Sequence, residues 1–162
     1  MKFSLIAAAS AIAFAATANA DSYSFVNLYS GDSLRGTCQS IAFKGVYGEC
    51  YDVSGVRNPV RSAAFGNGEH IKNRFTVTFY DTANCGGRWT RASFKKSFGL
   101  WASWDYLDNV SGNVKSVKVT NDLAPSGSGQ NNDYALSKKL TFRNCFPTSE
   151  HNLPETLPDL DG

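Results

Sequence analysis

The chain has 162 residues, of which 42% are hydrophobic and 19% are charged, and its formal net charge is +2. This length suits one domain with its own hydrophobic core and excludes an array of several large domains. The basic residues include isolated pairs, Lys95-Lys96 and Lys138-Lys139, and no continuous basic stripe of the kind that binds nucleic acid. We therefore predict a monomer with no nucleic-acid partner.

The first 20 residues have the pattern of a secretory signal peptide. Lys2 supplies a positive charge, the apolar run Phe3–Ala16 follows, and residues 18–20 (Ala-Asn-Ala) form a small-residue cleavage site. We expect the mature chain to begin at Asp21 and to be secreted to the extracellular space. The apolar run is short for a bilayer and no comparable run follows, so we predict no transmembrane segment.

The mature part contains four cysteines, Cys38, Cys50, Cys85 and Cys145. Export makes two disulfide bonds the expected arrangement. A zinc site is disfavoured because there is no Cys-x-x-Cys pair and both histidines lie far from any cysteine cluster. Four cysteines allow three connectivities, and proximity along the chain favours Cys38 with Cys50 and Cys85 with Cys145.

Two pairs of strand-like segments follow one another along the mature chain. Phe25–Tyr29 and Phe75–Phe79 alternate apolar and polar residues, and each leads through a tyrosine into a turn-prone stretch. Val60–Phe65 and Val114–Val119 are a second strand type that closes each unit. Because no stretch has sustained helical periodicity, these patterns predict an all-β antiparallel sandwich.

The segments recur at a nearly constant spacing. Tyr29 and Tyr80 are 51 positions apart, and Ser62 and Ser116 are 54 positions apart. A constant offset of this kind indicates an internal duplication. We therefore expect one domain over residues 21–120, built from two similar units at about 21–66 and 73–120.

Two eight-residue segments, 29–36 and 80–87, resemble the Greek-key motif of the βγ-crystallin superfamily. That motif has an aromatic residue, four residues, a second aromatic, one residue, a glycine and a distant serine. The matching residues are Tyr29, Gly36 and Ser62 in the first unit and Tyr80, Gly87 and Ser116 in the second. The aromatic ring covers a folded-over hairpin, the glycine takes a left-handed backbone, and the serine hydroxyl binds the loop. Leu34 and Cys85 depart from the second aromatic position.

The resemblance also implies a calcium site in each unit, but the corresponding residues are unsuited to it. These degenerate positions are Arg57, Asn58, Arg61, Ser111, Gly112 and Lys115. Cations stand at the two Ser/Thr ligand positions, Arg61 and Lys115, where they repel a divalent ion. We therefore predict no bound metal and no cofactor.

Aromatic residues crowd the second unit, where they can either fill the core or bind sugar. Trp101 and Trp104 lie in a loop-like segment, with Tyr106 and the hydrogen-bonding Asp105 beside them. Rings and carboxylates in such a cluster are typical of sugar-binding sites, so these four residues are the candidate binding residues. Trp89 alternates with polar neighbours and is expected in the core.

The C-terminal quarter has a different composition. Residues 121–133 are rich in Ser, Gly and Asn and predict a flexible linker. Residues 134–146 predict a strand or arm tied back by Cys145, and 147–162 a disordered acidic tail. Asn109 begins an Asn-Val-Ser sequon and is a candidate for glycosylation in a eukaryotic host.

No catalytic constellation is recognisable in the sequence, so we predict that the chain is not an enzyme. The chain resembles yeast killer toxins of the βγ-crystallin superfamily in size, secretion and duplicated motif. This resemblance implies a secreted, antimicrobial or effector-like binding protein that acts on cell walls or membranes. The expected partner is then a cell-wall polysaccharide or a target protein. Bacterial metalloproteinase inhibitors resemble the same fold and suggest a protease inhibitor that presents the loop 38–50. An extracellular structural protein without a discrete site is the third possibility.

Overall fold

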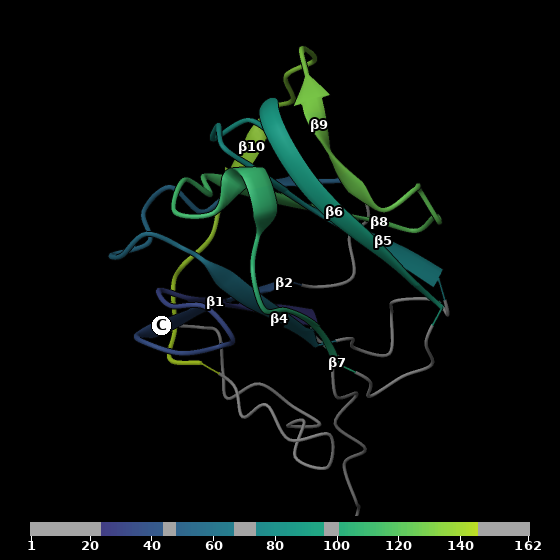
Figure 1. Cartoon of the computed structure of the whole chain (residues 1–162). Coiled ribbons are helices and arrows are strands. Elements are labelled where there is room, and N and C mark those ends of the chain that lie inside the picture. Colours follow the sequence, from purple (N-terminus) through teal and green to yellow (C-terminus); the bar gives the residue numbers. More distant parts are fainter. Residues whose placement is uncertain (1–23, 44–47, 67–73, 96–100, 146–162) are drawn as a thin grey trace, which may run out of the picture.

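The computed structural model describes residues 24–43, 48–66, 74–95 and 101–145, and these residues form ten strands (Figure 1). The elements are β1 (Ser24–Tyr29), β2 (Cys38–Phe43), β3 (Cys50–Asp52), β4 (Ser62–Gly66), β5 (Arg74–Tyr80), β6 (Gly87–Lys95), β7 (Trp101–Trp104), the 3₁₀ turn η1 (Asp108–Val110), β8 (Ser116–Thr120), β9 (Gly127–Asn131) and β10 (Ser137–Lys139). Among these residues no helix is long and apolar enough to cross a membrane.

The strands form two sheets, and each unit of four strands contributes to both. The orders are β2-β1-β4-β7 and β10-β3-β8-β5-β6-β9. The third strand of each unit crosses to the sheet of the other: β3 pairs with β8, and β7 pairs with β4. All pairings are antiparallel except that of β10 with β3. The predicted all-β class and two-sheet sandwich are therefore confirmed, and the exchanged strands interlock the units.

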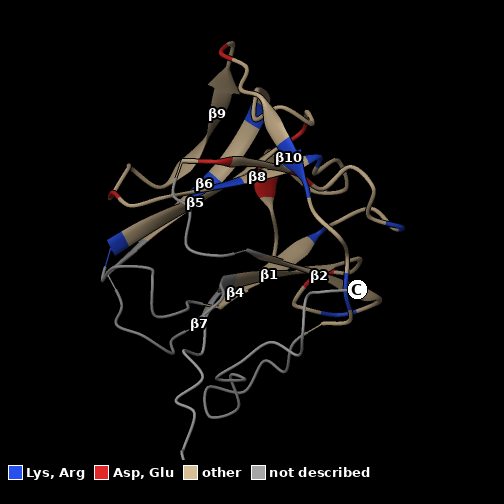
Figure 2. Cartoon of the chain, turned by 180° about the vertical axis from the view of Figure 1, so that it is seen from behind, with Lys and Arg blue, Asp and Glu red and all other residues tan. Residues whose placement is uncertain are grey.

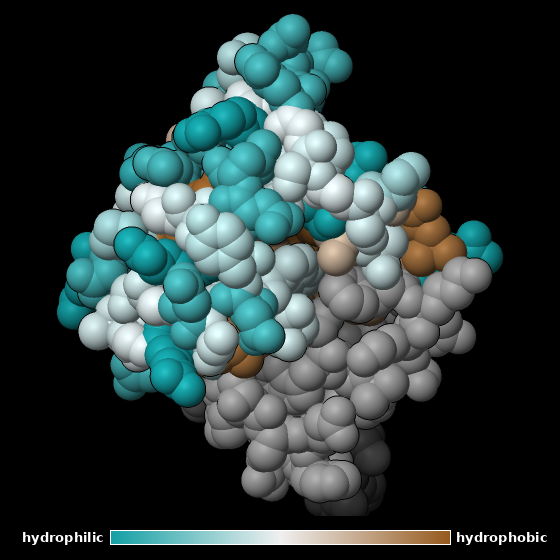
Figure 3. Space-filling model, in the orientation of Figure 1, coloured by the Kyte–Doolittle hydropathy of each residue, from teal (hydrophilic) through white to brown (hydrophobic). Residues whose placement is uncertain are grey.

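The core lies between the two sheets and uses the inward-facing residues of both. Phe65 of β4 and Phe75 of β5 are fully buried, with ring centroids 4.9 Å apart. Val26 and Leu28 of one sheet join the same buried cluster as Val77 of the other. On the face shown in Figure 3, hydrophilic residues cover most of the described part. Burial of the apolar core side chains between the two sheets drives the sheets together.

The first unit has a tightly folded corner at the end of β1. Tyr29 ends the strand, is 8% exposed, and pairs in register with Ser62 of β4. The Ser62 hydroxyl donates to the Gly31 carbonyl at 2.6 Å and accepts from the Leu34 amide at 3.0 Å. Leu34 and Gly36 have φ angles of +58° and +82°. The serine thus ties down a left-handed loop, and glycine meets the backbone requirement without a Cβ clash.

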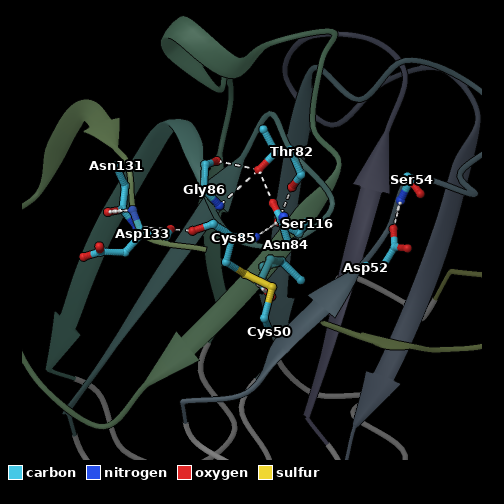
Figure 4. Close-up of a disulfide and its surroundings, with 11 residues drawn as sticks. Cys50, Asp52, Ser54, Thr82, Asn84, Cys85, Gly86, Ser116, Asn131 and Asp133 are labelled. Atoms are coloured by element: carbon cyan, nitrogen blue, oxygen red, sulfur yellow. Dashed lines mark hydrogen bonds between the residues drawn. A yellow bond between two sulfur atoms is a disulfide. The ribbon is translucent and has the colours of Figure 1, made fainter. Parts of the chain in front are cut away.

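The second unit repeats this corner at the end of β5. Tyr80 is also 8% exposed and pairs with Ser116 of β8. The Ser116 hydroxyl donates to the Thr82 carbonyl at 2.5 Å and accepts from the Cys85 amide at 3.0 Å (Figure 4). Cys85 and Gly87 have φ angles of +56° and +73°. The two corners therefore share the same serine hydrogen bonds and left-handed loop, as expected of a duplicated unit, and Tyr80 additionally packs against the Cys50–Cys85 bridge.

The disulfide connectivity differs from the expected one. Cys38 bonds to Cys145, and Cys50 bonds to Cys85. The predicted pairs, Cys38 with Cys50 and Cys85 with Cys145, are therefore wrong. The reason is the strand exchange: β3 leaves its own unit for the second sheet, which carries Cys50 to the corner that holds Cys85. Distance along the chain is a poor guide to distance in space when strands cross between sheets.

Residues 137–145 form a segment that we call the C-terminal strap. It begins as β10 on the edge of β3 and continues to the four-stranded sheet, where Arg143 and Ser40 exchange two backbone hydrogen bonds of 2.8 and 2.9 Å. The bond from Cys145 to Cys38 closes it. Figures 1 and 2, seen from opposite sides, both show it running from β10 toward β2. The strap therefore joins the edges of both sheets.

The predicted flexible linker over 121–133 does not hold for Gly127–Asn131, which form β9 on the edge of β6. A Cβ on Gly129 would lie 2.8 Å from Cε2 of Trp89, so the missing side chain makes room for the indole. The small residues that suggested flexibility thus permit close packing. The predicted signal peptide, 1–20, and the predicted tail, 147–162, lie outside the described residues.

Buried tyrosines predict a loss of stability at alkaline pH. Burial and, to a smaller extent, the Glu49 carboxylate together raise the pKa of Tyr51 to about 12. Burial also raises the pKa of Tyr29 and Tyr80. Each ring stays neutral in the fold while its unfolded form ionises near pH 10, so its stabilisation is present below pH 10 and is lost as pH rises toward the folded-state pKa, which is about 12 for Tyr51.

We therefore expect the urea midpoint to fall between pH 9 and pH 11.5, with a contribution from Tyr51 of up to about 2 kcal/mol. Equilibrium unfolding monitored by circular dichroism measures it. In Tyr51→Phe the fall should be shallower, because phenylalanine cannot ionise. Equal slopes for the wild type and Tyr51→Phe would contradict the assignment to Tyr51.

Candidate functional site

One described member of the predicted sugar-binding cluster, Trp104, does not lie on the surface. Trp104 is 9% exposed and packs edge-on against Phe79, with ring centroids 5.0 Å apart, so it belongs to the core and the surface prediction is wrong for it. The reason is that β7 crosses into the first sheet and turns Trp104 inward. Tyr106, 53% exposed, and Asp105 lie on the surface beyond β7. Trp101 begins β7, but its side chain lies outside the described part of the structure.

Trp89, expected in the core, lies instead on the outer face of β6. It is half-buried against a small cluster formed by Tyr80 and the Cys50–Cys85 bridge. The Arg91 guanidinium stacks 4.3 Å from the centroid of the indole. This side of the ring is therefore already occupied by a cation, and Trp89 serves to attach β9 to the sheet.

Residues at and beside the positions that correspond to calcium ligands form backbone hydrogen bonds between the β3–β4 loop and the β7–β8 loop. The Gly112 amide donates to the Val60 carbonyl at 2.6 Å, and the Leu107 amide to the Arg61 carbonyl at 3.0 Å. Arg61 lies 4.0 Å from Asp32, at the limit of an ion pair. In the described ranges no three metal-ligating side chains come together.

The remaining calcium-like positions are occupied in other ways. The side-chain amide of Asn58 donates from Nδ2 to the Thr37 hydroxyl at 2.8 Å, so it joins the β3–β4 loop to the β1–β2 hairpin. Lys115 is exposed, and its amide donates to the Tyr80 carbonyl at 2.8 Å. Ser111 follows η1, where its amide donates to the Asp108 carbonyl at 3.2 Å. Asn109 is exposed within η1, and its glycosylation stays a prediction.

A pocket of about 470 Å³ opens between β2, the β3–β4 loop and the C-terminal strap. We call it the arginine pocket. Its described lining residues are Cys38, Gln39, Arg57, Phe142, Arg143 and Asn144. The volume lies within the range of small-molecule sites, about 300–1,000 Å³.

Covalent and hydrogen bonds fix the backbone of each wall of the arginine pocket. The Cys38–Cys145 bond joins the start of β2 to the end of the C-terminal strap. Arg143 is held by its paired backbone bonds to Ser40. The Arg57 amide donates to Oε1 of Gln39 at 2.6 Å. The two arginines therefore extend from backbone positions that are set before any ligand arrives.

The arginine pocket is positively charged. None of its described lining residues is acidic, and within the described ranges neither Arg57 nor Arg143 forms an ion pair. Other basic side chains do have acidic partners, such as Arg88 with Asp81 at 2.7 Å. Two arginines that line one pocket, with no acidic residue among its described lining, can receive an anion.

A second exposed feature is the loop between β9 and β10, the apical loop (residues 132–136). Asn131 holds its start through bonds to the Asp133 backbone of 3.0 and 3.1 Å, and the Ala135 amide donates to the Asn84 carbonyl at 2.8 Å. Figure 4 shows Asn131 and Asp133 beside the Cys50–Cys85 corner. Leu136 is nevertheless 99% exposed. A rigid loop thus presents an apolar side chain to solvent.

Sequence reasoning singled out Arg57 only as a degenerate metal ligand and did not connect it with Arg143. The two are 86 positions apart, and they meet because the strap returns to β2. The signal that could have brought them together is the Cys38–Cys145 pairing, one of the three connectivities that the sequence allows.

No model of a protein family, no curated protein and no solved structure matches the chain. The function therefore has to be inferred from the chemistry of the arginine pocket and the apical loop. The first is a charged concave site and the second a rigid convex one, so they suit different kinds of partner.

Proposed function

We propose that the chain is a secreted, non-enzymatic binding protein that attaches to anionic components of cell walls or membranes, as an antimicrobial, killer-toxin-like protein or an effector does. The observation that carries this proposal is the arginine pocket, where Arg57 and Arg143 line one cavity without a described acidic neighbour. Cell walls and lipid surfaces present carboxylate and phosphate groups, which guanidinium groups bind through paired hydrogen bonds.

The architecture supports assignment to the βγ-crystallin superfamily as two Greek-key units. The third strands are exchanged between sheets, and the two corners repeat the same tyrosine, glycine and serine geometry. Two disulfide bonds and a strap across both sheet edges give the stability that an extracellular protein needs. The fold is thus a rigid support for a surface site, which suits binding.

Co-sedimentation with intact fungal and bacterial cells, and with their purified walls, tests this proposal. We expect the mature protein to sediment with at least one wall type at low salt and to be released as the salt concentration rises, because ions screen exposed charges. Growth of the same cells in its presence distinguishes a toxin from a passive binder. If no cell or wall fraction retains the protein at low salt, the proposed function is wrong.

The apical loop supports inhibition of a secreted protease as a second candidate function. A preorganised loop loses little conformational freedom when it enters a cleft, and a fully exposed leucine fits an apolar specificity pocket. This loop replaces the region 38–50 as the candidate, because Cys38 and Cys50 are not bonded to each other and do not close that loop.

Titration of thermolysin-type and subtilisin-type proteases tests the second candidate. We expect near-stoichiometric inhibition of one of them and a loss of about tenfold or more in Leu136→Ala, since a buried leucine loses about 2 kcal/mol or more on truncation. Tyr106→Ala, at another exposed ring, is the matched control and should inhibit like the wild type. Full activity of both proteases at a tenfold excess of the protein would exclude this candidate for them.

A further inference from the structure

We infer that the ligand of the arginine pocket is a sugar unit that carries an acidic group. This inference rests on the proposed function, because it names what the chain binds on a cell surface. Three properties of the pocket carry it: two arginines, a half-buried phenylalanine, and two residues with amide side chains on the same lining.

The cations define the acidic group. Arg57 comes from the β3–β4 loop and Arg143 from the strap, so the two arginines line the cavity from two elements. The acids in described ion pairs, Asp32, Asp81 and Glu49, are held by other basic side chains. An acidic group entering the cavity therefore meets two cations without a competing carboxylate on the lining. A planar carboxylate or a phosphate is the group that such a pair recognises.

The ring defines the sugar. Phe142 is half-buried, packs against the core, and has Cε2 3.3 Å from the position that a Cβ on Gly55 would occupy. Its ring is thus fixed from one side and contributes an apolar wall to the cavity. The apolar face of a sugar ring packs on such aromatic walls, whereas an inorganic anion gains nothing from one.

The amides match hydroxyl groups. Gln39 uses Oε1 to accept from the Arg57 amide, so its Nε2 remains a donor for the ligand. Asn144 adds a second amide at the rim, where it is exposed. A sugar hydroxyl can accept from one amide and donate to the other. The cavity volume of about 470 Å³ suits one or two sugar units, and the walls are fixed by the Cys38–Cys145 bond.

Isothermal titration of the mature protein with defined soluble sugars tests the inference. The probes are galacturonate and glucuronate oligomers for the carboxylate source, mannose 6-phosphate for the phosphate source, and neutral β-glucan oligomers. We expect binding of the carboxylated or the phosphorylated probes and none of the neutral ones. Arg57→Gln and Arg143→Gln should each weaken binding by about tenfold or more, because each removes a charge-assisted hydrogen bond.

Arg74→Gln is the matched control, because it makes the same change on an exposed arginine of the other sheet, at the start of β5. It should bind within about twofold of the wild type, and thermal unfolding should show all three variants folded. Two results would overturn the inference. One is that the wild type binds no acidic probe, and the other is that Arg74→Gln weakens binding as much as the two pocket variants do.

The failures of the inference and of the proposed function are distinguishable. If the protein sediments with cells but binds no acidic sugar, the proposed function stands and the inference is overturned. Binding of acidic sugars without sedimentation supports the inference and overturns attachment to the cells examined. If Arg57→Gln or Arg143→Gln loses thermal stability, Phe142→Leu provides a second test of the pocket. This variant keeps an apolar wall but removes the aromatic ring. It should weaken binding of the sugar probes and leave binding of inorganic phosphate unchanged.

Discussion

Trp104→Ala is expected to lower the free energy of unfolding by about 3–5 kcal/mol, the range for truncating a large aromatic residue in a core. Trp104 is 9% exposed and packs edge-on against the buried Phe79. The substitution removes an aromatic pair and leaves a cavity between the sheets, where the surrounding strands relax only in part. Urea-induced unfolding followed by circular dichroism measures the change.

Tyr106→Ala provides the comparison, because Tyr106 is two positions away and 53% exposed. Its effect should stay within about 0.5 kcal/mol, as for most surface substitutions. Similar stability losses in both variants would show that Trp104 is not packed as described. Binding to walls should survive Trp104→Ala at temperatures where the variant is folded, since this ring lies in the core and not in the arginine pocket.

The sequence was sufficient to predict the features that depend on local spacing. Tyrosine, glycine and serine recur at fixed intervals, and each has a role determined by a few neighbouring backbone atoms. Ser62 and Ser116 both donate to a loop carbonyl and accept from a loop amide, with nearly equal distances. Alternation of apolar residues likewise predicted the central strands, because one face of each must be buried.

Features that depend on which strands become neighbours could not be read in this way. The pattern Gly-Ser-Gly-Gln-Asn of β9 has little strand propensity and forms a strand because the edge of β6 offers backbone partners and Trp89 packs on Gly129. Trp104 looked like a loop residue because β7 is short and leaves its own unit. Tertiary context decided both placements.

The arginine pocket combines these two kinds of information. Arg57 lies in the β3–β4 loop of the first unit, while Arg143 comes from the strap, which follows the second unit. The strap thus forms one wall of the cavity beside the β3–β4 loop. The loop supplies one arginine, and the strap supplies the second arginine and encloses the cavity.

Removal of the Cys38–Cys145 bond, as Cys38→Ala with Cys145→Ala, is expected to lower the free energy of unfolding by about 4.7 kcal/mol. The bond spans 107 positions, and the entropy that a cross-link removes from the unfolded chain grows with loop length. In the fold, the strap would keep its short pairing with β3, the Lys138–Glu49 ion pair, the bridge at Ser40 and its apolar contacts. The arginine pocket would then lose a fixed wall.

Cys50→Ala with Cys85→Ala separates loss of stability from loss of the pocket. This bond spans 35 positions, so its removal is also destabilising, by about 3–4 kcal/mol in the same treatment, but it lies at the corner of the second unit. Below the unfolding temperatures of both variants, we expect binding of acidic sugars to persist without Cys50–Cys85 and to fall about tenfold or more without Cys38–Cys145, because preorganisation is lost. Equal affinities in the two variants would mean that the strap does not need its disulfide to hold Arg143 in place.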